Sequence, residues 1–103
     1  EEIELPSSYL SLKSYPNPYN KSATFVVNLP REGNTRIKIF NILGELVKEI
    51  DLGLIHGGVY NVKWNGKNQY ENEVSSGIYI AQLELNNTYS GNQKTFLKLL
   101  YMK

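Results

Sequence analysis

The sequence predicts an all-β domain, an antiparallel β-sandwich of about seven strands. Its composition suits strands joined by tight turns, because eight tyrosines, twelve asparagines and eight glycines accompany only two alanines. Short apolar alternations recur along the chain, and a turn signal separates each one from the next. With 103 residues, the chain is long enough for one domain with one modest core.

Residues 1–14 are predicted to form a linker or an edge segment, and the domain proper is expected over residues 15–103. A proline followed by two serines is typical of a linker, whereas Leu10 and Leu12 favour an extended segment along a sheet edge. Tyr15–Asn20 reads Tyr-Pro-Asn-Pro-Tyr-Asn. It is a stiff, extended entry, because each proline fixes its own φ and restricts the residue before it.

Three strands are expected in the first half of the domain. In Thr24–Leu29 every second residue is apolar, and Pro30 ends the strand. A polar turn then leads into Thr35–Asn41, whose isoleucines fall on one face. Leu46–Ile50 is a shorter strand with a weak pattern, and Gly53 follows it.

Three further strands are expected in the second half. Val59–Trp64 alternates most clearly, with aromatic and aliphatic residues on one face and polar residues on the other. The polar loop Asn65–Glu73 separates it from Ile78–Leu85, and the last strand is Lys94–Leu100. The core is expected to form from Phe25, Val27, Ile37, Ile39, Tyr60, Val62, Trp64, Tyr79 and Leu83.

Composition excludes several function classes. A net charge of +1 argues against general nucleic-acid binding, and no apolar run approaches the roughly 18 residues of a membrane-spanning helix. The chain has no cysteine and one histidine, which removes disulfides, thiolate nucleophiles and multi-histidine zinc sites. His56 precedes two glycines, so it is predicted to be a turn residue rather than a general base. We therefore expect no enzyme, no catalytic residue and no cofactor.

Two loop features suggest binding. Asn65–Glu73 offers amide and carboxylate oxygens, which suit Ca²⁺, but it lacks aspartate and the spacing of an EF-hand. A turn is favoured there over a metal site, and calcium binding is left open. Five tyrosines are expected in loops or at the termini, where exposed rings would suit a carbohydrate, but their spacing is irregular. They are Tyr15, Tyr19, Tyr70, Tyr89 and Tyr101.

The end of the chain is basic. No acid follows Glu84, whereas Lys94 and Lys98 share one strand face and Lys103 is the last residue given. Lysines on a final strand either protect an edge from unwanted pairing or form a basic strand that a partner reads. An exposed edge would also allow two copies of the chain to pair.

Several short motifs, taken together in their order and spacing, resemble a known family. Tyr15–Asn20 is similar to the Asn-Tyr-Pro-Asn-Pro-Phe-Asn opening of the type A C-terminal sorting domains of the type IX (Por) secretion system, found in Bacteroidetes. Asn65 stands where that family usually has aspartate, and Tyr70–Asn72 lacks its common glycine. The other similar segments are Ile39–Glu45, Gly57–Tyr60, Trp64–Lys67, Ser76–Tyr79 and Lys94–Lys103.

The resemblance implies an immunoglobulin-like (Ig-like) sandwich that directs an upstream cargo domain through the periplasm and outer membrane to the cell surface or the medium. Its implied partners are the outer-membrane translocon and a sortase-like peptidase. The implied sorting-motif residues are Pro16, Asn17, Pro18, Gly77, Tyr79, Lys94, Lys98 and Lys103. The alternatives are an Ig-like spacer or assembly module, as in flagellar hook-capping proteins, and a carbohydrate-binding accessory module of a secreted hydrolase.

Overall fold

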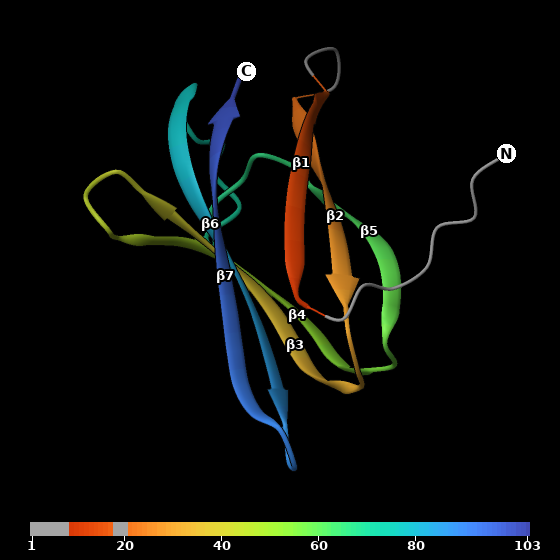
Figure 1. Ribbon diagram of the computed structural model, residues 1–103. Helices are drawn as coiled ribbons and strands as arrows, with labels where there is room; N and C mark the ends of the chain where they lie inside the picture. Colours follow the sequence, from red (N-terminus) through yellow and green to blue (C-terminus); the bar gives the residue numbers. More distant parts are fainter. Residues whose placement is uncertain (1–8, 18–20) are drawn as a thin grey trace, which may run out of the picture.

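The computed structural model describes residues 9–17 and 21–103, which form seven strands and no helix. This confirms the predicted all-β class (Figure 1). No helix in the described ranges has the length and hydropathy that a membrane crossing requires. The strands are β1 (Ser11–Asn17), β2 (Ser22–Leu29), β3 (Gly33–Asn41), β4 (Leu46–Ile55), β5 (Gly58–Trp64), β6 (Gly77–Asn87) and β7 (Gly91–Tyr101).

Two antiparallel sheets pack face to face, as in an Ig-like sandwich (Figure 1). The three-stranded sheet has the order β1-β2-β5, and the four-stranded sheet has the order β4-β3-β6-β7. The two edge strands β1 and β7 lie beside each other on one side of the sandwich. The first and last strands of the chain therefore close the same side.

The core lies between the sheets and confirms most of the predicted set. Phe25, Ile37 and Leu83 are fully buried, for example, as alternation requires. Tyr60 and Val62 pack against the core but are only partly buried, because β5 is an edge strand. The buried apolar cluster comprises Leu12, Ala23, Phe25, Val27, Leu29, Ile37, Ile39, Trp64, Tyr79, Ala81, Leu83, Leu99 and Tyr101.

The fourth strand is longer than predicted. β4 continues beyond Ile50 to Ile55, because two register shifts against β3 let it bend without ending. The shifts lie at Thr35/Arg36 and at Ile39/Phe40, and Gly53 has a positive φ of 72° beside the first. Each bulge interrupts the two-residue period, which explains the weak pattern in the sequence.

Tyr15, Pro16 and Asn17 of the stiff entry form the end of β1. Pro16 is opposite Ala23 of β2, and its other side has no hydrogen-bonded strand partner because β1 is at the sheet edge. A proline is tolerated there, since a missing N–H on the free side breaks no ladder bond. This agrees with the prediction that the segment is extended.

Candidate functional site

Three aromatic residues pack together at one end of the sandwich. The ring centroids of Trp64 and Tyr101 are 5.1 Å apart, and those of Trp64 and Tyr79 are 5.7 Å apart in an edge-to-face arrangement. Tyr101 is only 2% exposed, so its prediction as an exposed loop tyrosine is wrong. The last strand runs one residue further than predicted, and alternation turns Tyr101 inward.

Each of these three rings donates one hydrogen bond to a backbone carbonyl, which offsets the cost of burying its polar atom. Trp64 Nε1 donates to the carbonyl oxygen of Lys67 at 3.0 Å. Tyr101 Oη donates to that of Lys21 at 3.0 Å. Tyr79 Oη donates to that of Ser75 at 2.7 Å. The rings therefore hold the surrounding loops to the core.

Burial changes the titration of the two tyrosines. Loss of solvation raises the pKa of Tyr79 above its ordinary value. The pKa of Tyr101 is also raised, first by burial and then by the negative charge of Glu73 and by Tyr79. Both hydroxyls therefore stay neutral donors at physiological pH.

The last residue of the chain is held at the same end. Glu73 Oε1 lies 3.5 Å from Lys103 Nζ and 3.8 Å from Lys21 Nζ. The backbone N–H of Lys103 donates to Ser76 Oγ at 2.9 Å. Since these groups are partly exposed, each ion pair alone contributes little to stability. Together, the ion pairs and the hydrogen bond hold the end of β7 in place. We call Trp64, Tyr79, Tyr101, Glu73, Ser76 and Lys103 the end cluster.

Two glycines at this end differ in role. A Cβ at Gly77 would meet nothing within 4 Å, so close packing does not require glycine there. Gly77 instead has a φ of 156°, which favours glycine. Gly66 is the close contact: a Cβ there would overlap Tyr101 Oη and lie 3.0 Å from the carbonyl oxygen of Lys21.

The proline motif is partly described. Pro16 is exposed near the end of β1, and Asn17 Nδ2 donates to Thr24 Oγ1 at 2.9 Å. Pro18 lies outside the described residues, as does Tyr19 of the tyrosine set. Asn17 therefore stabilises the β1–β2 pairing rather than pointing to a ligand.

The lysines of the last strand lie apart from the end cluster. Lys94 and Lys98 project from the outer face of the four-stranded sheet, where Lys94 is opposite Glu84 and Lys98 is opposite Ile80 of β6. The structure therefore divides the predicted motif residues between one end of the sandwich and one sheet face. No single described site contains them all.

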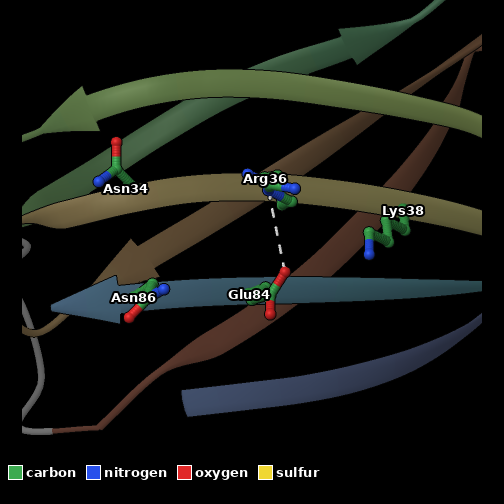
Figure 2. Close-up of a pocket in the computed structure, with 5 residues that line it drawn as sticks. All are labelled: Asn34, Arg36, Lys38, Glu84 and Asn86. Atoms are coloured by element: carbon green, nitrogen blue, oxygen red, sulfur yellow. Dashed lines mark ion pairs between the residues drawn. The ribbon is translucent and has the colours of Figure 1, made fainter. Parts of the chain in front are cut away.

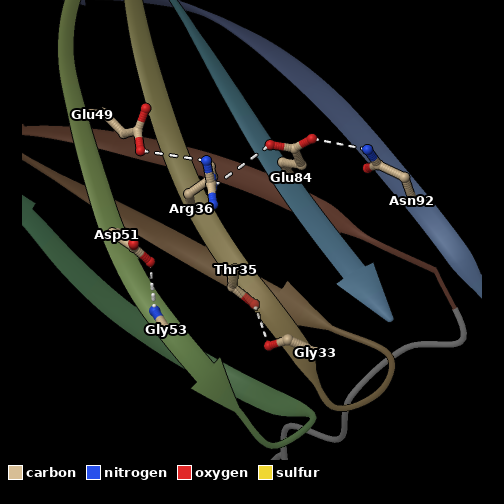
Figure 3. A network of polar contacts seen from close by, with 8 residues as sticks. All are labelled: Gly33, Thr35, Arg36, Glu49, Asp51, Gly53, Glu84 and Asn92. Atoms are coloured by element: carbon tan, nitrogen blue, oxygen red, sulfur yellow. Dashed lines mark hydrogen bonds and ion pairs between the residues drawn. The ribbon is translucent and has the colours of Figure 1, made fainter. Parts of the chain in front are cut away.

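The outer face of that sheet carries a network of polar side chains (Figure 3). The guanidinium of Arg36 lies 3.6 Å from Glu49 Oε2 and 3.9 Å from Glu84 Oε1. Asn92 Nδ2 donates to Glu84 Oε2 at 2.9 Å. The network thus links β4, β3, β6 and β7 across the whole sheet.

A hollow with a volume of about 270 Å³ lies over this network, and Figure 2 shows the residues that line it. Asn34, Arg36, Lys38, Glu84 and Asn86 line it. The sequence alone does not reveal this surface, because its residues come together only through the pairing of β3 with β6.

The polar loop is a set of capped turns. Asn68 Oδ1 accepts the N–H groups of Tyr70 and Asn72, and Asn65 Oδ1 accepts that of Lys67. Glu71 Oε2 lies 3.5 Å from Lys48 Nζ. These contacts give the loop oxygens structural partners, as the turn hypothesis predicts. The described residues contain no group of three His, Cys, Asp or Glu side chains suited to a metal.

The remaining candidate residues, His56 and the exposed tyrosines, lie far apart on the surface. His56 is exposed, and its Nδ1 lies 3.1 Å from Glu32 Oε1. The exposed tyrosines Tyr15, Tyr70 and Tyr89 lie on β1, in the polar loop and in the β6–β7 turn, so they form no shared platform.

The model of one protein family, the FlgD Ig-like domain, matches residues 19–89 of the chain. No curated protein matches the sequence. FlgD from P. aeruginosa is 24% identical with a TM-score of 0.64, over 75% of this chain and 61% of that one. FlgD from Xanthomonas campestris, described with hook capping essential for flagellar assembly, is 21% identical with a TM-score of 0.66, over 91% of this chain and 66% of that one.

Dimeric latent PorU from Porphyromonas gingivalis is also similar. It is 20% identical with a TM-score of 0.74, over 91% of this chain but 9% of the PorU chain. The chain thus spans about three fifths of the first FlgD structure and a small part of PorU. At these identities the likenesses establish a shared fold, the Ig-like sandwich.

Proposed function

The chain belongs to the FlgD Ig-like domain family, and from this membership we propose that it is a non-catalytic module that spaces or joins parts of a protein assembly. The observation that carries the proposal is the family match, which extends from the β1–β2 connection through β6. The geometry supports it, because Trp64, Asn68 and Glu73 all serve structural contacts. The proposed location is the cell surface or the medium, reached through the periplasm.

The test is to remove residues 9–103 from the full-length protein that carries them, in its native host. We expect the shortened protein to be exported but to fail to join its complex, as measured by co-purification of that complex from the cell surface. Tyr89→Ser, a change at a fully exposed turn residue, should leave assembly unchanged. Normal assembly of the shortened protein would contradict the proposal.

A second candidate is a sorting signal for the type IX secretion system, acting on an upstream cargo domain and read by the translocon and a sortase-like peptidase. The end cluster favours it, because it brings Tyr79 against Tyr101 and binds Lys103 to Ser76 at one end of the sandwich. A receptor would find there a rigid surface that costs little entropy to bind.

One fusion separates the two candidates. Residues 1–103 are fused to a periplasmic reporter in a bacterium that carries the type IX system. Reporter at the cell surface supports the sorting function, and Lys103→Ala should then reduce it more than Lys67→Ala, which changes a loop lysine with no described ion pair. A reporter retained in the periplasm contradicts sorting and leaves the assembly module.

A further inference from the structure

The outer face of the four-stranded sheet carries more apolar surface than a solvated sheet face requires. Outward positions of such a sheet are normally polar. Here Phe96 is 63% exposed, Leu100 58% and Ile78 41%. Phe40 and Ile80 lie between them on β3 and β6 and are half-buried. We call Leu46, Phe40, Ile80, Ile78, Leu100 and Phe96 the apolar half of this face, and Lys98 lies among them opposite Ile80.

The other half of the face is charged, and its charges alternate. Strand register places Asp51, Arg36, Glu84 and Lys94 in one row across β4, β3, β6 and β7. The signs along this row are therefore minus, plus, minus and plus. From β7 to β4 the signs run plus, minus, plus and minus, so the reversed row of a second copy would place an opposite charge against each charge of the first.

We propose that this face is the contact surface for a second copy of the chain, with the two four-stranded sheets packed face to face about a twofold axis that runs along the strands between β3 and β6. This rotation places Lys94 of one copy opposite Asp51 of the other, and Arg36 opposite Glu84. It also sets Phe40 of each copy opposite Ile80 of the other, with Leu46 opposite Lys98 and Phe96 opposite Glu49. Aligned packing at about 30°, with sheets about 10 Å apart, is the usual geometry for such faces.

A dimer in which the β7 edges of two copies pair fits the sequence less well than the face-to-face dimer. An antiparallel β7–β7 ladder centred on Phe96 would set Lys94 opposite Lys98 of the second copy, and like charges directly opposed are unfavourable. The β7 edge also has β1 beside it. A twofold face-to-face contact instead meets the self-complementarity that a symmetric dimer demands.

Sedimentation equilibrium of the 103-residue chain from about 1 µM to about 1 mM tests the proposal. We expect a monomer–dimer equilibrium, and Phe96→Ser and Leu100→Ser should each raise the dimer Kd by about tenfold or more. Tyr89→Ser, at a turn residue 98% exposed and outside this face, should leave the Kd unchanged. Thermal unfolding of each variant confirms that its fold is intact.

A charge-swap cycle tests the arrangement of the two copies. Lys94→Glu and Asp51→Lys should each raise the dimer Kd, and the double variant should restore it towards the original value. A chain that stays monomeric to about 1 mM overturns the proposal, as does a Phe96→Ser effect no larger than that of Tyr89→Ser, or a double variant without restoration. Because the assembly function needs only some partner, a monomeric chain would overturn this inference and leave that function standing.

Discussion

Gly66 allows the last strand to close against the loop that follows β5. Its φ of 71° suits glycine, and a side chain there would occupy the space of Tyr101 Oη. The sequence identifies Gly66 as part of a turn, but only the folded chain shows that Tyr101 lies above it. A contact between residues so far apart along the chain leaves no local signal.

We predict that Gly66→Ala destabilises the domain more than Gly91→Ala does. Both glycines have positive φ, so alanine costs about 1 kcal/mol at either position. Only at Gly66 does the new methyl group displace Tyr101, and such overpacking adds about 1–3 kcal/mol. Urea denaturation measures both values. Equal losses would show that the contact with Tyr101 has no energetic weight.

The buried tyrosines make stability depend on alkaline pH. In the folded chain the pKa values of Tyr79 and Tyr101 lie above 10.0. The stability that their neutral hydroxyl groups contribute is therefore fully present below that pH. It is lost as the pH rises through the folded values, because the unfolded chain then releases protons more readily. We expect the free energy of unfolding to fall more steeply above pH 10 in the wild type than in the Tyr79→Phe/Tyr101→Phe variant, by urea titration. If the free energies of unfolding of the two proteins fell in parallel above pH 10, the tyrosines would not be the cause.

At the scale of strands, the last strand is both a structural and a candidate recognition element. Leu99 and Tyr101 face the core, whereas Lys94 and Lys98 face solvent. Removing the strand to test sorting therefore also removes core residues. Point changes at the outward lysines separate the two roles, since they leave the inner face intact.

We predict that deletion of residues 94–103 unfolds the domain, whereas deletion of Met102 and Lys103 does not. The long deletion removes the buried Leu99 and Tyr101 and leaves β6 without its partner on the β7 side. The short deletion removes two exposed residues and the bond to Ser76. Near-ultraviolet circular dichroism reports native packing in each case. A native spectrum from the long deletion would contradict this role of β7.

Alternation predicted the regular strands well and the irregular ones poorly. Every second residue of β2, β3 and β6 is buried, so the residues on their inner faces can be predicted from the sequence. The inner face of β4 cannot be predicted in this way, because two bulges shift the alternation of inward and outward residues along the strand. The outer-face network is likewise hidden, since Arg36 meets Glu84 only after the register of β3 with β6 is set.

At the scale of the molecule, both sheets contribute to a single core. Phe25 comes from one sheet and Leu83 from the other, and both belong to the same buried cluster. The sequence predicted a sandwich of about seven strands but not its strand order, in which β2 pairs with β5 and β3 with β6. Such pairings join distant segments and depend on the whole chain.

We therefore expect the domain to unfold in one cooperative step. Fluorescence of Trp64 reports the core, and far-ultraviolet circular dichroism reports both sheets, so their urea transitions should coincide. Trp64→Ala should lower the free energy of unfolding by about 3–5 kcal/mol, because the ring is 1% exposed. Separate transitions for the two probes would show that the sheets unfold independently.

The parallel course of β1 and β7 determines how the sandwich would carry tension. Both strands run towards the same end, so Ser11 and Tyr101 mark opposite ends of the sandwich (Figure 1). A pull between these two residues would slide β1 lengthwise along β2 and β7 along β6. The bonds of each ladder would then bear the load together, whereas a sideways pull on Tyr101 would peel β7 away one pair at a time. The sandwich is thus built to resist stretching along its strands.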